Sequence, residues 1–301
     1  MLHRVLVIGL GRMGSALAAT LLKNDYAVAV WNRTESKGAP LVEAGATLAG
    51  CVAEGIDAND LIVICVSNYP DAALLLEDCG DLSGKTVVQL TSASSSDARV
   101  MEAWVIQRGG LYLDGEILSF PSDVGTKECR ILAAGSQDAW REGKPVVMCL
   151  GSNSRYLGDN ISAPAALNAA LMFSELALTM AMVQGVQIIE KEGMDIGEYV
   201  GMFAEMVSAN DGREIRRQGN AIARNAFGDT EAALETWEAA IVGLVEDHAQ
   251  LGIDVEFPRA ICNLLNRAAE AGYGKEEVAA VIKVMRSETS PTSEGAPRAA
   301  V

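Results

Sequence analysis

The first 32 residues constrain the fold of this chain more than any other stretch. An apolar run at 5–8 leads directly into glycines with the spacing GxGxxG, an apolar helix-like segment follows, and a second apolar run stands at 27–31. In this pattern the first glycine makes a tight turn, the second lets the backbone approach a pyrophosphate, and the third lets the helix pack against the strand. The order of strand, turn, helix and strand predicts a dinucleotide site. Its expected contacts are Gly9, Leu10, Gly11, Arg12, Met13 and Gly14.

The end of the second predicted strand indicates which dinucleotide binds. An acidic residue about 20 positions past the glycines would bind a free ribose 2′-hydroxyl, and the chain has none there. A guanidinium and an ammonium stand at that place, and both can bind a 2′-phosphate. NADPH is therefore expected rather than NADH, with solvated loop charges as the alternative interpretation. The expected contacts are Asn32, Arg33, Thr34 and Lys37.

The composition limits the classes of partner. Of the 301 residues 50% are hydrophobic, and the formal net charge is −16. This content is ample for two ordinary cores, whereas the negative charge argues against a nucleic acid or an anionic membrane as partner. The N-terminus lacks a signal-peptide pattern, and the 6 cysteines form no CxxC pair. We expect a cytoplasmic protein with reduced cysteines and, with only 2 histidines, no metal site.

Strand-like and helix-like segments alternate through the first half of the chain. After the first two, apolar runs occur at 60–67, 85–90, 110–118 and 130–134. Such alternation predicts a mostly parallel sheet with helices on both faces, here a Rossmann domain over residues 1–160. Ligands of these sheets lie beyond the carboxyl ends of the strands. The loop residues expected to contact the cofactor are Val66, Ser67, Thr91 and Ser92.

The segment 163–189 is almost continuously apolar and predicts one long helix between two domains, over residues 161–191. Its length would permit a membrane span, but polar side chains interrupt it, so a buried helix of a soluble assembly is expected instead. One protomer cannot cover so much apolar surface, which predicts a homodimer. Asn168, Glu175 and Thr179 share one face of this helix. That face is either the wall of a cleft or an ordinary helix interface.

The remaining chain is helical by composition up to residue 286, with Gly252 and Gly272 as typical helix ends. We expect an all-α domain over residues 192–286 and a disordered polar tail over 287–301. The expected fold class is α/β, with an N-terminal Rossmann domain, a long interdomain helix and an all-α C-terminal domain.

Several segments resemble a known enzyme family. The glycine motif at 9–14 followed by WNRT at 31–34 resembles the 6-phosphogluconate and β-hydroxyacid dehydrogenase superfamily, which includes the imine reductases. YLDGEILSFP at 112–121 and the run from 271 to 286 resemble the imine reductase branch. The resemblance spans nearly the whole folded chain. It implies an NADPH-dependent oxidoreductase that reduces the C=N bond of an imine or iminium to an amine by hydride transfer.

Position 168 separates the branches of this superfamily. By the resemblance, a hydroxyacid dehydrogenase carries a lysine where this chain has Asn168, and no lysine stands between Lys144 and Lys191. An ammonium would repel an iminium, which is already positive, so its loss favours reduction of C=N over C=O. The alternatives are a β-hydroxyacid dehydrogenase-like reductase that acts on a carbonyl and a non-catalytic NADPH-binding protein.

The resemblance also implies roles around the substrate. Imine reductases usually carry Asp or Tyr at the place of Asn168 and often an aromatic residue near Leu176. Asparagine is no general acid but hydrogen-bonds a substrate nitrogen, and Glu175 is the alternative group to hold the cation or relay a proton. Ser92 is expected to contact the nicotinamide ribose or the substrate nitrogen. The expected catalytic residues are Asn168, Glu175 and Ser92.

The substrate pocket is expected between the Rossmann face, the long helix and the helical domain of a partner, as in a domain-sharing homodimer. Phe120 and Met172 would shape this pocket, and Trp237 would close it. Ordinary core packing is the alternative for Met172 and Trp237.

Overall fold

The computed structural model describes residues 4–77, 79–92, 94–208 and 212–288. The chain forms two compact units, Met1–Phe173 and Ser174–Val301, and the division falls inside the long helix α7 (Ala163–Lys191). The expected tail lies outside the described residues from position 289 on. The domain boundaries at 160, 191 and 286 stay predictions.

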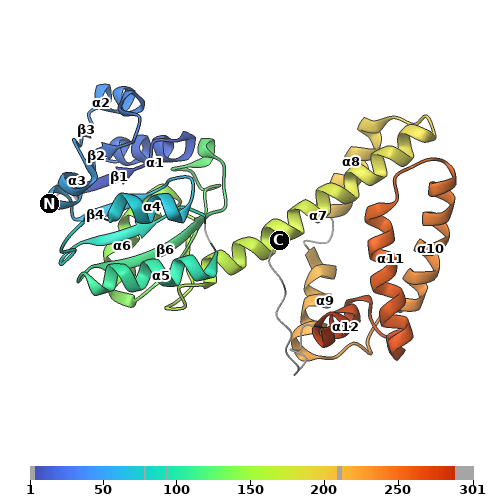
Figure 1. Ribbon diagram of the computed structural model, residues 1–301. Coiled ribbons are helices and arrows are strands. Elements are labelled where there is room, and N and C mark those ends of the chain that lie inside the picture. Colours follow the sequence, from blue (N-terminus) through green and yellow to red (C-terminus); the bar gives the residue numbers. More distant parts are fainter. Residues whose placement is uncertain (1–3, 78, 93, 209–211, 289–301) are drawn as a thin grey trace, which may run out of the picture. The chain divides into compact units, whose positions relative to one another are not determined.

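Within the described residues, the N-terminal unit contains an eight-stranded sheet with the strand order β3-β2-β1-β4-β5-β6-β7-β8 (Figure 1). Its neighbours pair in parallel except β6 and β7, which pair antiparallel. The order changes direction at β1, which is the arrangement of a doubly wound sheet. The strands are β1 (Arg4–Ile8), β2 (Ala27–Trp31), β3 (Thr47–Leu48), β4 (Leu61–Ile64), β5 (Thr86–Gln89), β6 (Leu111–Ile117), β7 (Ile131–Gly135) and β8 (Arg155–Tyr156).

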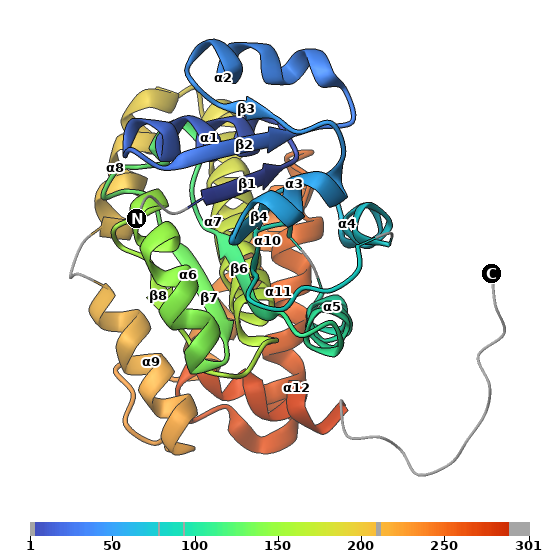
Figure 2. The ribbon, with the colours of Figure 1, turned by 90° about the vertical axis from the view of Figure 1, so that its left-hand side faces the viewer.

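Helices cover both faces of this sheet (Figure 2). Because side chains alternate along a strand, Val5 and Val7 of β1 enter one apolar core, and Leu6 and Ile8 enter the other. The first core packs against α1 and α6, and the second packs against α3, α4 and α5. The helices of this unit are α1 (Arg12–Lys23), α2 (Ala39–Glu43), α3 (Val52–Ala58), α4 (Tyr69–Leu76), α5 (Ser95–Gln107) and α6 (Gln137–Leu150). The expected Rossmann architecture is confirmed.

Two strands, β3 and β8, are not predicted by the sequence pattern. β3 and β8 are two residues long each, which is too short for any alternation of apolar and polar residues to show. Both form at the outer edges of the sheet, where a longer neighbour supplies the hydrogen-bonding partner. Their formation therefore depends on tertiary pairing rather than on local sequence.

In the C-terminal unit the described secondary structure is helical, as expected, apart from one isolated β-bridge between Ala233 and Glu277. Small apolar cores form among its helices, one around Leu234 and Leu265 and another around Val245 and Cys262. Besides the end of α7, the helices are α8 (Ile196–Ser208), α9 (Arg213–Arg224), α10 (Leu234–Gln250), α11 (Glu256–Ala268) and α12 (Ile282–Glu288).

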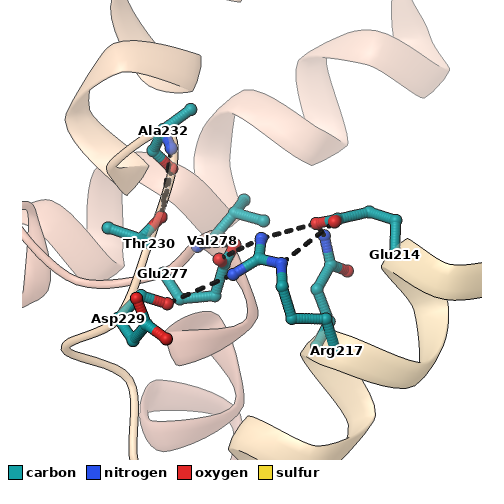
Figure 3. A network of polar contacts seen from close by, with 8 residues as sticks. Glu214, Arg217, Asp229, Thr230, Ala232, Glu277 and Val278 are labelled. Atoms are coloured by element: carbon teal, nitrogen blue, oxygen red, sulfur yellow. Dashed lines mark hydrogen bonds and ion pairs between the residues drawn. The ribbon is translucent and has the colours of Figure 1, made fainter.

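A buried ion pair fastens α9 to the rest of this unit (Figure 3). The guanidinium of Arg217 pairs with Glu277, which is 1% exposed, at 2.5 Å, and with Glu214 of its own helix at 2.6 Å. Arg217 also donates to the carbonyl oxygen of Asp229 at 3.2 Å. Arg217 thus connects α9 to the loop at Asp229 and to Glu277. Leaving the buried carboxylate of Glu277 unpaired would cost folding free energy.

The long helix α7 leaves much apolar surface uncovered within one chain. Its mean hydropathy reaches 1.6, and by length and composition alone it could cross a membrane. Phe173 is 70% exposed, and Met202 on α8 is 65% exposed. The apolar surface of α7 and α8 comprises Leu167, Leu171, Met172, Phe173, Leu176, Leu178, Met180, Val183, Ile196, Val200, Met202, Met206 and Val207.

Candidate active site

The glycine loop between β1 and α1 is built by close backbone contacts. Gly9 has a φ of +96°, and a Cβ there would collide with the carbonyl oxygen of Cys65 after β4. A Cβ at Gly14 would collide with the carbonyl oxygen of Gly9. At Gly11 a Cβ would meet no heavy atom within 4 Å. Gly9 and Gly14 therefore serve the fold, whereas Gly11 leaves open space in front of the N-terminus of α1, where a pyrophosphate fits.

A cavity of ≈ 380 Å³ opens at this loop, at the carboxyl ends of β1, β2 and β4. Most of the residues expected to bind the cofactor line it, and Trp31, Cys65, Asp71, Leu74 and Leu75 line it in addition. The expected residues in its lining are Gly9, Gly11, Arg12, Met13, Gly14, Asn32, Arg33, Thr34, Lys37, Val66 and Ser67. Leu10 is 2% exposed and lies in the apolar core, and Thr91 and Ser92 lie outside this lining.

The end of β2 offers cations to a phosphate. Arg33 and Lys37 are both exposed and both line the cavity, which suits a ribose 2′-phosphate. Both polar groups of the Asn32 side chain are hydrogen-bonded to the backbone. Its Oδ1 accepts from the backbone N–H of Leu10 at 2.9 Å, and its Nδ2 donates to the carbonyl of Thr34 at 2.9 Å. Asn32 therefore fixes the glycine loop against the loop that carries Arg33.

Thr91 joins the ends of two strands. Its hydroxyl accepts from the backbone N–H of Val66 at 3.1 Å, and its own N–H donates to Oε1 of the buried Gln89 at 3.1 Å. The loops after β4 and β5 are thereby held side by side. Thr91 thus supports Val66, which lines the cavity, and places Ser92 one residue further along the same edge.

The structure brings Ser92 and Asn168 together on one carboxylate that the sequence reasoning missed. Oε2 of Glu116 accepts from Oγ of Ser92 at 3.1 Å and from Nδ2 of Asn168 at 3.1 Å. Glu116 lies on β6 and is 2% exposed. One signal was present in the sequence: the polar residues at 112, 114 and 116 alternate within an otherwise apolar strand, which places them on one face.

A second buried carboxylate, Asp114, lies on the same face of β6. It accepts hydrogen bonds from the hydroxyl of Tyr69 and from that of Tyr112, the latter at 3.2 Å. Burial raises the pKa of Asp114 to about 7, against the two tyrosine hydrogen bonds, which lower it. Burial also raises the pKa of Tyr69 and of Tyr112. Asp114 therefore favours its protonated, neutral form inside the sheet more than an exposed carboxyl does.

The other expected site residues are exposed within one chain. Phe120 stands before the short 3₁₀ turn Pro121–Asp123 and is 74% exposed, and Met172 lies on α7. Glu175 and Trp237 belong to the C-terminal unit, where the backbone carbonyl of Glu175 accepts from the hydroxyl of Thr179 at 3.1 Å. The roles of these four residues at a substrate stay predictions.

Models of two protein families match consecutive parts of this chain. Residues 4–158 match the NAD-binding domain of 6-phosphogluconate dehydrogenase, and residues 160–287 match the C-terminal domain of NADPH-dependent reductive aminase-like proteins. An NADPH-dependent reductive aminase of Aspergillus oryzae is 30% identical over 93% of this chain and 96% of its own. The chain belongs to the imine reductase and reductive aminase family.

Solved structures of this family share the whole fold. An imine reductase from Myxococcus stipitatus in complex with NADP⁺ is 30% identical, with a TM-score of 0.86 over 94% of this chain and 99% of that one. A reductive aminase from Aspergillus terreus, in complex with NADPH4, cyclohexanone and allyl amine, is 28% identical, with a TM-score of 0.85 over 95% of this chain and all of that one. The expectations of an NADPH-dependent oxidoreductase and of C=N reduction are confirmed.

A substitution at Gly11 tests whether the glycine loop binds the pyrophosphate of NADPH. A methyl group at Gly11 would fill the space left for the pyrophosphate without touching the protein, so Gly11→Ala should fold normally. We expect the dissociation constant for NADPH to rise at least about tenfold, which corresponds to about 1.4 kcal/mol. Gly14→Ala is the matched control, because it should lower the melting temperature instead. Unchanged NADPH affinity in a folded Gly11→Ala protein, measured by calorimetry, would contradict this assignment.

The raised pKa of Asp114 predicts a pH-dependent stability. Native Asp114 keeps its proton up to about pH 7, whereas an ordinary aspartate releases it near 3.8. The unfolded state thus binds fewer protons in this window, and this group should lower the free energy of unfolding by about 1 kcal/mol per pH unit as the pH rises. Above pH 7 its contribution is constant.

Asp114→Asn tests this because the amide oxygen still accepts from both tyrosines but does not titrate. In urea unfolding, the stability of the variant relative to the wild type should increase between pH 4 and pH 7. Asp57→Asn, at an exposed position, should leave the pH dependence unchanged. If the free energies of unfolding of Asp114→Asn and the wild type changed equally with pH, Asp114 would not titrate as described.

Proposed function

We propose that this enzyme uses Asn168 and Ser92 to bind the nitrogen of an imine or iminium while the C=N bond is reduced with NADPH. The observation that carries this proposal is the pair of side chains that meet on Glu116 next to the cofactor edge of the sheet. No ammonium stands at position 168 to polarise a carbonyl oxygen, and an iminium needs none. An imine, or a ketone and an amine that condense to one, is the proposed substrate class.

Residues of the cavity would hold the cofactor. The open space at Gly11 and the N-terminus of α1 fit a pyrophosphate, and Arg33 and Lys37 fit a 2′-phosphate. NADPH, when bound, supplies the hydride for the substrate carbon. The protein's own contribution is to orient the substrate and exclude water.

We also propose that a second copy of this chain covers the apolar surface of α7 and α8, and that the protein is cytoplasmic. That surface is too extensive to stay in water on a soluble monomer. Sedimentation velocity should therefore give the mass of a dimer, and Phe173→Glu should shift the protein towards monomers. Ile215→Glu, which changes an equally exposed residue of α9, should leave the dimer intact. A monomeric wild type would contradict the proposal.

The function is tested by following NADPH consumption with a small cyclic imine, 1-pyrroline, and with NADH in parallel. We expect turnover with NADPH preferred. Arg33→Ala should lower kcat/KM for NADPH by about 10-fold to 100-fold, because a charge-assisted contact to the 2′-phosphate is lost, and should change the NADH reaction little. Lys23→Ala, at the far end of α1, is the control.

A 3-hydroxy acid with NADP⁺ serves as the competing substrate. Oxidation of the hydroxy acid without reduction of the imine would contradict the proposal and favour a carbonyl reductase. NADPH binding without turnover of either substrate would also contradict it.

A further inference from the structure

The carboxylate of Glu116 organises the substrate side of the site. A single oxygen, Oε2, accepts hydrogen bonds from Ser92 and Asn168, which come from the loop after β5 and from the first turns of α7. Glu116 is 2% exposed, whereas Ser92 is exposed and Asn168 is half-buried. The negative charge of Glu116 is therefore buried beneath the neutral side chains of Ser92 and Asn168. We call these three residues the carboxylate cluster.

The carboxylate cluster lies on the path that an extended dinucleotide would follow. The cavity runs from Arg33 at the end of β2, past the glycine loop, to Val66 and Ser67 after β4. β5 and β6 are the next strands in the sheet, and Thr91 joins the loop of β5 to Val66. If Arg33 held the 2′-phosphate, the loops after β4 and β5, which carry Val66 and Ser92, would be the next along this edge of the sheet to meet the cofactor.

The hydrogen bonds determine what the carboxylate cluster offers a ligand. Glu116 takes an N–H of Asn168, so the amide is oriented with Oδ1 turned away from the carboxylate. Ser92 uses its hydroxyl hydrogen on the same oxygen and keeps only lone pairs for other partners. Both side chains thus present acceptors. These acceptor oxygens suit the N–H of an iminium, whereas a ketone oxygen could use only the second N–H of Asn168.

We infer that Glu116 is a positioning residue that orients Asn168 and Ser92 as acceptors and makes the site selective for a protonated, cationic C=N group. This inference rests on the proposed function. In the balanced reaction a proton from solvent first joins the imine nitrogen. NADPH would supply the hydride that adds to the carbon and would become NADP⁺, and the π electrons of the C=N bond become the lone pair of the amine. Glu116 acts through its charge and through the hydrogen bonds that it accepts from Ser92 and Asn168.

Other titratable groups surround Glu116 and have to be separated from it. Asp114 shares its strand, Tyr69 approaches from α4, and Glu102 of α5 acts on Asp114. All three are acidic or phenolic groups. Asp114 has a pKa of about 7, within the range in which an imine would be assayed, so Asp114→Asn is a necessary comparison in any pH profile.

Binding measurements test the inference independently of turnover. With NADP⁺ present, calorimetry compares protonated pyrrolidine with the neutral ring cyclopentanone. In Glu116→Gln, which keeps the shape and an acceptor oxygen, the affinity for protonated pyrrolidine should fall at least tenfold, and that for cyclopentanone should not change. Glu128→Gln, at an exposed acid before β7, is the control. Equal pyrrolidinium affinity in a folded Glu116→Gln protein that still binds NADPH would overturn the inference.

A pH profile of kcat supplies the second test. With 1-pyrroline, Glu116→Gln should lose activity at a pH about one unit lower than the wild type, because less of the bound imine is protonated. With the permanently charged N-methylpyrrolinium, kcat should be independent of pH in both proteins, and KM should rise in the variant through the loss of the Glu116 charge alone, since this ion has no N–H. Asp114→Asn should keep the wild-type profile, and a shift in Asp114→Asn alone would overturn the inference.

The two proposals fail in different ways. A wild type that binds NADPH but does not reduce 1-pyrroline contradicts the proposed function, and the binding comparison then still decides the role of Glu116. A wild type that reduces 1-pyrroline, with a Glu116→Gln variant that matches it in pyrrolidinium affinity and pH profile, refutes the role of Glu116 alone.

Discussion

The close backbone contact between Gly9 and Gly14 determines where every part of the cofactor site lies. The N–H of Gly9 donates to the carbonyl of Trp31 at 2.9 Å, and the N–H of Cys65 donates to the carbonyl of Ile8 at 2.9 Å. The ends of β1, β2 and β4 and the start of α1 therefore meet within one turn. A side chain at Gly9 or Gly14 would push these ends apart. The ends of these strands are consequently positioned by close backbone contacts, and the side chains of Asn32 and Thr91 then fix the loops that follow them.

Strand β6 differs from its neighbours, because it buries polar groups where the fold does not need them. On β7 the residues paired with Asp114 and Glu116 are Ala134 and Leu132, while on β5 the residue paired with Asp114 is the buried Gln89. Burying a carboxyl costs free energy unless hydrogen bonds compensate, and here Asp114 has two tyrosines while Glu116 has Ser92 and Asn168. Burying two carboxyl groups in the middle of a sheet does not favour folding. Their presence is therefore better explained by a role in the reaction than by stability.

The sequence predicts the architecture because that architecture follows from local periodicity. The glycine spacing, the apolar strands and the long helix each occupy one continuous segment, so their patterns are visible without the fold. The alternation of polar residues along β6 places Glu116 on one face, but its partner Asn168 is 52 positions away and nothing local identifies that partner. The edge strand β3 is similar, since its two residues become a strand only beside β2. Contacts that depend on tertiary pairing were therefore the ones that were missed.

The placement of charge gives a role to Asn168, at a position where the resemblance implies Asp or Tyr in imine reductases. The chain carries a net charge of −16, yet Arg33 and Lys37 line the cavity, and outside its lining the buried carboxylate of Glu116 accepts from Ser92 and Asn168. A carboxylate in direct contact with the iminium would stabilise the charged ground state, and the positive charge disappears as hydride arrives. Such ground-state binding would be lost in the transition state and would lower kcat. A charge set back behind Asn168 and Ser92 favours protonation of the imine while keeping that loss small, because Coulomb energy falls with distance.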